Sequence, residues 1–293
     1  MQIVDPHIHF WELGTDAYQW LTSTAETFIG AANRLDRRFL PPDLFEGAKD
    51  IEIVKIVHVE ALRNPKSPID ETRWLQSLAD EGDFPQGIVA AADLSSPDVE
   101  SILEQHRSFD NVRGIRQILN RHMDPVYNYV DTDYLNDSTW CHQFQLLKKF
   151  DLSFDLQLYP KQVPDACRII DASPDTVFVL NHTGMFVDRT LEGYRQWRDG
   201  LAALSKRDNV FVKISGLGMF DHEWTVESFR PYVLQTLDFF GVERSMFASN
   251  FPVDKLFSDY VRVWTAFDEI TQGFSVDERK SLFCVNAETV YRI

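Results

Sequence analysis

Eight short apolar runs rich in β-branched residues recur along the whole chain, and they alternate with amphipathic stretches of helical spacing. The runs are residues 3–10, 51–60, 87–94, 112–119, 152–159, 176–182, 209–215 and 245–250. The amphipathic stretches include 70–81, 97–108, 138–150, 194–207 and 228–241. Strands that alternate with helices predict a parallel sheet. Eight such repeats in 293 residues predict a single α/β domain over residues 1–293, a (β/α)8 barrel.

An open, doubly wound sheet is the alternative fold. No glycine-rich phosphate loop follows any of the predicted strands, which disfavours it. Two connections, residues 10–50 and 119–137, are too long for simple barrel turns, and both follow the C-terminal end of a strand. Because that end of a barrel carries the active site, we expect both connections to form lids. Near the C-terminus, Ser275 and Glu278 form the capping-box pattern of a helix start.

Charge and composition narrow the class of function. The chain has 29 basic and 45 acidic residues, a formal charge of −16. Such a surface repels phosphate backbones and anionic lipids, so we expect neither a nucleic-acid nor a membrane partner. No run of 18 apolar residues and no signal-peptide pattern is present, which predicts a cytoplasmic protein. Cys141, Cys167 and Cys284 are widely spaced and are expected to be buried, reduced thiols.

Polar residues gather near the C-terminal ends of the predicted strands, at positions that share one inward-facing parity within each strand. They are Asp5, His7 and His9 on the first strand, His58 and Glu60 on the second, Arg116 on the fourth, Asp155 and Gln157 on the fifth, His182 at the end of the sixth, and Asn250 at the end of the eighth with Asp254 four residues later. Polar groups are costly to bury unless they are paired. Their concentration at one end of the barrel therefore predicts a functional site.

The His-x-His pair carries the sharpest expectation. His7 and His9 alternate on one strand, so both imidazoles point the same way and are close enough to share one cation. For other polar residues, a purely structural role is an alternative to a functional one. Glu60 and Arg116 can form a buried salt bridge, and Lys213 on the seventh strand can end in a buried ion pair. His106 and His142 lie in predicted helices and follow no motif, so we expect both on helix surfaces.

The residues around this pattern have two interpretations each. Arg116 and Arg121 form either ion pairs or a clamp for a substrate carboxylate. Gln157 shares its strand's inward parity, and Trp11 directly follows the first strand, where it packs in the core or the lid.

Four motifs together resemble a known family. DPHIHFWE at the N-terminus, GIRQIL on the fourth strand, NHTG on the sixth and SNFPVD on the eighth resemble the amidohydrolase superfamily. More narrowly, they resemble its metal-dependent-hydrolase-like branch, which holds sugar-acid lactonases and the pyrone-dicarboxylate lactonase. The resemblance runs from residue 3 to the C-terminal helix. It implies a (β/α)8 barrel whose active site lies at the C-terminal ends of the strands.

The resemblance also implies roles for individual residues. His7, His9 and His182 match the family's histidines, which implies metal ligands. Binuclear relatives carry a carboxylated lysine at the end of the fourth or fifth strand, and this chain has none there, so at most one divalent metal ion, zinc or manganese, is expected. The branch also includes lactonases described as working without a metal, and there the same histidines would donate hydrogen bonds to a carbonyl. Arg116 matches an arginine that such enzymes use near anionic substrates.

The eighth strand departs from the family pattern. Asn250 stands where the superfamily usually has an aspartate that acts as general base, and an amide cannot take up a proton at neutral pH. The base is therefore expected to be Asp254 or Glu60.

These observations predict a hydrolase that opens a lactone, or a related cyclic ester, of a small acidic or sugar-derived molecule. The predicted catalytic residues are Asp254, Glu60, His182 and Asn250, and the predicted substrate contacts are Arg116, Arg121, Gln157 and Trp11. The rival activities are a non-oxidative decarboxylase or a hydratase on the same barrel. A third alternative, which Asn250 keeps open, is a barrel that has lost catalysis and only binds a ligand. The oligomeric state, homo-oligomer included, is left open.

Overall fold

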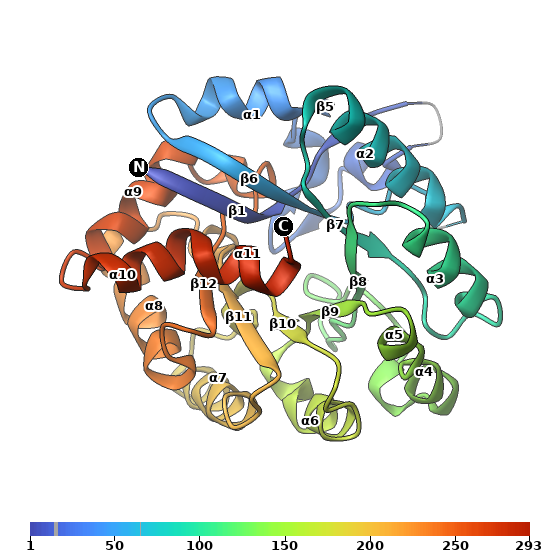
Figure 1. Cartoon of the computed structure of the whole chain (residues 1–293). Helices are drawn as coiled ribbons and strands as arrows, with labels where there is room; N and C mark the ends of the chain where they lie inside the picture. Colours follow the sequence, from blue (N-terminus) through green and yellow to red (C-terminus); the bar gives the residue numbers. More distant parts are fainter. Residues whose placement is uncertain (15–16, 65) are drawn as a thin grey trace.

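The computed structural model describes residues 1–14, 17–64 and 66–293. Its centre is an eight-stranded parallel sheet that curls into a nearly closed barrel, with strand order β1-β6-β7-β8-β9-β10-β11-β12 (Figure 1). An isolated parallel bridge between Ile8 and Phe251 joins the chain after β12 to β1. The strands are β1 Gln2–Ile8, β6 Glu52–Val59, β7 Gly87–Ala91, β8 Val112–Ile118, β9 Ser153–Gln157, β10 Phe178–Leu180, β11 Val210–Ile214 and β12 Ser245–Phe247. Each of the eight predicted runs coincides with one of them, although β1 begins one residue before its run, and this confirms the (β/α)8 fold.

Helices surround the barrel and connect its strands (Figure 1). They are α1 Pro41–Ala48, α2 Pro68–Gly82, α3 Val99–Arg107, α4 Ser138–Gln143, α5 Leu146–Lys149, α6 Val163–Asp171, α7 Leu191–Leu204, α8 Val226–Phe240, α9 Tyr260–Ile270, α10 Val276–Lys280 and α11 Asn286–Tyr291. The stretch predicted as one helix over 138–150 is divided between α4 and α5. At the start of α10 the capping box is present, because the Ser275 hydroxyl accepts from the Glu278 amide and the Glu278 carboxylate accepts from the Ser275 amide.

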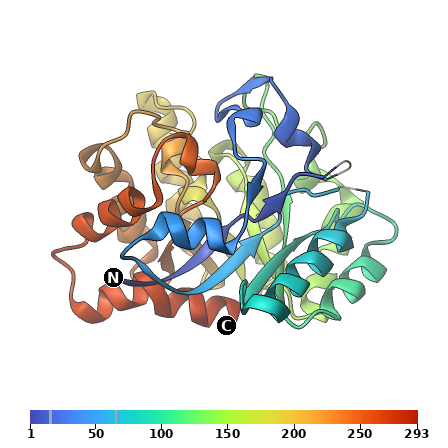
Figure 2. The same cartoon turned by 90° about the horizontal axis from the view of Figure 1, so that it is seen from above.

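The two ends of the barrel are closed differently. The π-helical turn Ser281–Val285 and helix α11, which follow α10, pack against β1 and β12 at the end where the strands begin. Figure 2 shows the two long connections on the opposite side, away from the chain ends. The first connection forms two small antiparallel pairs, β2 Trp11–Glu12 with β5 Arg38–Phe39 and β3 Glu26–Thr27 with β4 Gly30–Ala31, and two short 3-10 turns, η1 Gln19–Thr22 and η2 Ala32–Arg34.

The two connections also touch each other. The Phe28 amide donates to the Val126 carbonyl over 3.3 Å, and the Phe28 ring stacks on Tyr127 with centroids 5.8 Å apart. A third loop joins them, because the His222 ring Nε2 lies 2.9 Å from the Phe28 carbonyl oxygen. Phe28 therefore fastens the loops that follow β1, β8 and β11 into one cover.

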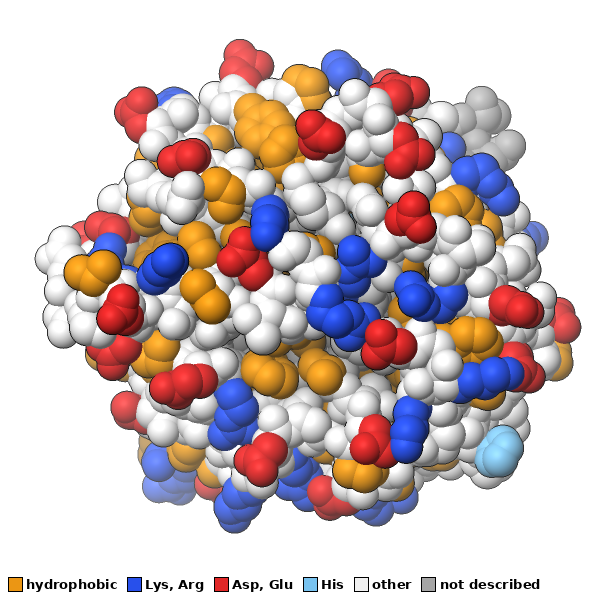
Figure 3. All heavy atoms as spheres, in the orientation of Figure 1, with side chains coloured by type: hydrophobic (Ala, Val, Ile, Leu, Met, Phe, Trp, Pro, Cys, Tyr) orange, Lys and Arg blue, Asp and Glu red, His pale blue; other side chains and the backbone are white. Residues whose placement is uncertain are grey.

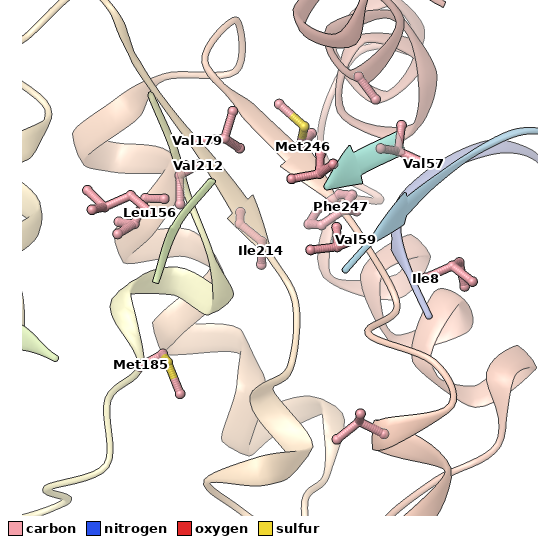
Figure 4. Close-up of a cluster of buried hydrophobic side chains, with 14 of the residues drawn as sticks. Ile8, Val57, Val59, Leu156, Val179, Met185, Val212, Ile214, Met246 and Phe247 are labelled. Atoms are coloured by element: carbon pink, nitrogen blue, oxygen red, sulfur yellow. The ribbon is translucent and has the colours of Figure 1, made fainter. Parts of the chain in front are cut away.

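Buried hydrophobic side chains fill the space around the strands (Figure 4). They include Val57 and Val59 of β6, Val212 and Ile214 of β11, and Phe247 of β12. The three cysteines are free; Cys167 and Cys284 are buried and Cys141 is half-buried. On the face seen in Figure 3, acidic and basic side chains are interspersed. Within the described residues, none of the helices combines the length and the apolarity that a membrane crossing requires.

One expectation about helix surfaces is wrong. His106 is fully buried, with its Nδ1 3.0 Å from the Thr72 hydroxyl and its Nε2 3.0 Å from the Ala91 carbonyl oxygen. The reason is the helical stripe of α3, in which Val99, Leu103 and His106 share the buried face.

Candidate active site

A cavity of about 270 Å³ lies at the C-terminal ends of the strands, beneath the cover of loops. Polar side chains from five strand ends line its floor: His9, Arg116, Gln157, His182 and Asn250. Trp11 lines it as well, together with residues of both long connections, such as Trp20, Ile29 and Tyr129. The structure therefore brings six of the predicted site residues to one small volume.

The three expected histidines lie next to one another. The His7 ring centroid is 5.0 Å from that of His9 and 4.6 Å from that of His182. Burial lowers the pKa of all three, that of His9 to about 3, so the imidazoles are neutral at neutral pH. The His9 Nδ1 lies 2.7 Å from the Val59 carbonyl oxygen. Because a carbonyl only accepts, Nδ1 carries the hydrogen, and His9 Nε2 is left with a lone pair.

The backbone holds two of the floor residues in the left-handed region. His182, two residues after the end of β10, has φ 51°, and Asn250, after β12, has φ 60°. Residues other than glycine rarely adopt such angles, and they cluster at functional sites. Behind His182, its Nδ1 lies 3.0 Å from the Ser215 hydroxyl, and a Cβ at Gly216 would lie 2.7 Å from the same nitrogen. Gly216 therefore leaves the room in which the His182 ring packs.

Arg116 is held on three sides by the barrel itself. Its Nε donates to Glu60 Oε1 over 2.7 Å, and its Nη2 donates to the Glu60 carbonyl oxygen over 2.5 Å. Its Nη1 donates to Gln157 Oε1 over 3.0 Å and lies 3.5 Å from His7 Nε2. Burial raises the pKa of Glu60, and the guanidinium opposes that rise. The buried salt bridge that the sequence left open as an alternative is present.

Asn250 separates Asp254 from the cavity. The Asn250 side-chain amide donates to Asp254 Oδ2 over 2.6 Å, and its backbone amide donates to the His7 carbonyl over 3.0 Å. Burial raises the pKa of Asp254 to about 7. A Cβ at Gly218 would lie 2.6 Å from Asp254 Oδ1, so only glycine leaves room for that carboxylate. Among the described residues that line the cavity, neither Asp254 nor Glu60 appears; both lie one side chain behind it.

Arg121 lies away from the floor. Its Nη1 is 3.3 Å from Asp133 Oδ2, and both side chains are substantially exposed. It is not among the described residues of the cavity lining. The position after β8 placed it near the correct end of the barrel, but the second long connection turns its side chain outward.

Arg121→Gln is therefore expected to be nearly silent. We expect kcat/KM to change less than about twofold and the free energy of unfolding to change by less than about 1 kcal/mol, since exposed ion pairs contribute little. Steady-state kinetics and denaturant unfolding check this. A tenfold rise in KM with unchanged kcat would instead show that Arg121 closes over the substrate.

Several residues that support the site were not predicted. Ser215, Met185 and Met219 belong to no motif, although Ser215 shares its strand parity with Lys213.

Lys213 forms a buried ion pair. Its Nζ lies 2.6 Å from Asp155 Oδ2, both side chains are fully buried, and the Tyr291 hydroxyl donates to the other Asp155 oxygen over 2.8 Å. The ion pair expected as one alternative for Lys213 is thus observed, with Asp155 as its partner.

The arrangement of His7, His9 and His182 shows whether they fit a metal ion. Over residues 1–14, 17–64 and 66–293, no group of three His, Cys, Asp or Glu side chains is arranged to hold a metal. His7 Nε2 lies 3.5 Å from Nη1 of Arg116, a cation, which opposes a second positive charge at that nitrogen. As arranged, the three histidines therefore do not fit a bound metal ion.

Comparisons with known proteins agree with this architecture. The family model described as amidohydrolase matches residues 4–293. The uncharacterized protein y4mH of Sinorhizobium fredii is 44% identical, with 99% of this chain and 98% of that protein covered. A protein of Burkholderia ambifaria named L-fucono-1,5-lactonase is 26% identical, with 99% and 95% covered. A crystal structure of an amidohydrolase from Burkholderia multivorans, determined with bound zinc, superposes with a TM-score of 0.83 at 24% identity, with both chains covered fully.

Proposed function

Because the chain belongs to the amidohydrolase family, we propose that it is a lactone hydrolase, which opens a lactone or related cyclic ester of a small molecule by attack of water. The observation that carries the proposal is the convergence of His9, His182, Arg116, Gln157 and Asn250 on one small cavity under a cover of loops. The relatives named L-fucono-1,5-lactonase support a lactone, and of the acidic and sugar-derived substrates expected from the sequence they favour the sugar-derived class.

The floor offers hydrogen-bond donors to a carbonyl oxygen. Gln157 Oε1 accepts from Arg116, so the group that Gln157 has left for a substrate is its amide NH₂. Arg116 Nη2 donates one hydrogen to the Glu60 carbonyl and has a second one to offer. Donors fixed in place before the reaction stabilise the negative charge that develops on the carbonyl oxygen.

The attacking water needs an acceptor for its proton. His9 Nε2 carries a lone pair and orients the water, but a pKa of about 3 makes it a weak base. Asp254, with a pKa of about 7, is poised to take up and release a proton near neutral pH, and we assign it the role of general base. Asn250 stands between Asp254 and the cavity, so the transfer requires the Asn250 side chain to turn aside or a water to enter beside it.

The bonds and protons then balance. The water oxygen bonds to the carbonyl carbon, the ring C–O bond breaks, and the proton held by the base passes to the leaving alkoxide. The product is a hydroxy acid, which releases one proton at neutral pH. A decarboxylase would instead release carbon dioxide without consuming water.

His9→Gln tests the proposal. We expect kcat/KM for lactone hydrolysis to fall by about 10²-fold, because glutamine lacks the ring that Val59 fixes through Nδ1, so its amide no longer holds the water in place. Acid release from a panel of aldonolactones, followed with a pH indicator, measures this, and His142→Gln on the outer helix α4 is the matched control. If wild-type protein released no acid from any lactone, or formed carbon dioxide from an aromatic carboxylate, the proposal would be wrong.

A divalent metal ion bound by His7, His9 and His182 is the alternative that the sequence predicts. The zinc in the Burkholderia multivorans structure belongs to that protein, and the arrangement of the three histidines here supports direct action of the side chains instead. We therefore propose hydrolysis without a bound metal.

A further inference from the structure

The cavity holds no uncompensated positive charge among its described lining residues. Arg116 is the single lysine or arginine there, and Glu60 Oε1 lies 2.7 Å from its Nε. Its five N–H hydrogens are largely committed, one to that carboxylate, one to the Glu60 carbonyl, and those of Nη1 to Gln157 and His7. A carboxylate binds arginine best through two parallel N–H groups, and Arg116 has one to spare.

The groups around Arg116 do not restore a positive field. The buried Lys213 is matched by Asp155 at 2.6 Å, and the floor imidazoles are neutral. Outside the cavity, the chain as a whole carries a formal charge of −16, which disfavours the approach of anions. An anionic substrate would thus lose its hydration without gaining a cation.

Beside the polar floor, and apart from Ser23, Thr27 and Tyr129, most of the remaining cavity lining is apolar. We call its residues Trp20, Ile29, Leu62, Ile118, Met185 and Val253 the apolar wall. Trp20 Nε1 donates to the Ala61 carbonyl over 2.7 Å, and that of the adjacent Trp11 donates to the Asp36 carbonyl over 2.8 Å. The single N–H donor of each indole is therefore already bonded to the backbone, so a ligand can contact only the ring carbons. Hydroxyl groups that face such a wall lose hydrogen bonds to water, whereas alkyl or aryl groups gain by burial.

We infer that the substrate is an uncharged lactone that carries an alkyl or aryl substituent, with its ester on the polar floor and the substituent against the apolar wall. This inference rests on the proposed lactone hydrolysis and names the substrate class. It departs from the acidic substrate expected from the sequence, because the arginine that suggested an anion is already paired with Glu60. It also departs from the sugar-derived class that the named relatives favour, because the apolar wall offers no partners for a row of hydroxyl groups.

Three δ-lactones of matched ring size test the inference: one with a butyl substituent, one aldono-1,5-lactone, and one with a ring carboxylate. We expect kcat/KM for the butyl lactone to exceed that for the aldonolactone by at least about tenfold and that for the carboxylate by at least about a hundredfold. Each methylene buried against the wall accounts for about a fourfold gain. Hydrolysis that favours the carboxylated or the aldono-lactone would overturn the substrate class and leave lactone hydrolysis standing. No hydrolysis of any of the three would overturn both.

Ile29→Thr probes the wall itself. The substitution places a hydroxyl on the wall, so we expect the butyl-to-aldono ratio of kcat/KM to fall about fivefold or more. That ratio does not depend on the fraction of folded protein, which keeps the test valid if the cover is weakened. Ile102→Thr on α3, a half-buried isoleucine outside the cavity lining, is the matched control and should leave the ratio unchanged. An unchanged ratio in Ile29→Thr would show that the wall does not select the substituent.

Discussion

Replacing Asp254 with asparagine is expected to lower kcat for lactone hydrolysis by about 10²–10⁴-fold, the usual contribution of a general base. The substitution keeps the size of the side chain and an oxygen that can accept from the Asn250 amide, which now lies 2.6 Å from Asp254 Oδ2. It removes a carboxylate next to the floor whose pKa, about 7, suits proton transfer near neutral pH. The loss should therefore appear in kcat and leave KM nearly unchanged.

The same pKa sets the pH dependence of wild-type activity. Because the ionised carboxylate takes the proton, kcat should rise with pH and level off above about pH 7, and Asp254→Asn should lose this limb. The effect on stability has the opposite sign. The folded protein binds the Asp254 proton more tightly than the unfolded chain, whose reference pKa is 3.8, so this group's contribution to stability falls as pH rises between those values. Asp254→Asn should then be at least as stable as wild type at pH 8.

Asp133→Asn is the matched control for this substitution. Asp133 pairs with Arg121 on the exposed side of the second long connection, so kcat should stay within twofold. Retention of kcat within tenfold in Asp254→Asn would exclude Asp254 as the base. Glu60, the other carboxylate predicted from the sequence, would then take its place.

Lys213→Met is expected to destabilise the fold by about 3–5 kcal/mol, because it leaves a buried carboxylate without its cation. The pair of Lys213 and Asp155 is fully buried, and its charged atoms are 2.6 Å apart. Burial lowers the pKa of Lys213 to about 8, so the amine keeps its proton at neutral pH. After the substitution, the Asp155 carboxylate keeps hydrogen bonds from the Tyr291 hydroxyl and the Asn181 side-chain amide, and neither donor carries a charge.

Urea unfolding measures this loss, and two further variants calibrate it. Lys255→Met breaks an exposed pair with Asp36 and should cost less than about 1 kcal/mol. The double variant Lys213→Met with Asp155→Leu removes both charges, so it should be more stable than Lys213→Met alone. A cost for Lys213→Met no larger than that of Lys255→Met would show that water or another group replaces the lost cation.

The barrel could be predicted because its signal is local. Each strand is a short run of β-branched residues between helical patterns, and strand parity indicates which side chains point inward. That reasoning placed His9, Gln157 and Asn250 on the cavity floor, together with Arg116 and His182. The repeated register of a parallel barrel brings the strand ends to one level, so residues distant in sequence meet without any further information.

Strand parity could not predict which inward-facing side chains reach the cavity and which lie behind others. Parity assigns Glu60 to the inward face, yet it does not show that Arg116 covers it or that Asn250 covers Asp254. The direction of Arg121 and the shape of the cover depend on contacts such as that of Phe28 with Val126, which lie about a hundred residues apart and have no sequence motif. The burial of His106 could have been predicted from the sequence, because His106 lies on the apolar face of its helix with Val99 and Leu103.

The most direct test of the account is a pH-stat measurement of lactone hydrolysis by enzyme that has been stripped with a chelator and freed of it by gel filtration. The account predicts one proton released for each lactone consumed, at the same rate before and after stripping. Proton release that disappears on stripping and returns with one equivalent of zinc would contradict the direct action of His9 and His182. No proton release from any lactone would contradict the proposed hydrolysis itself.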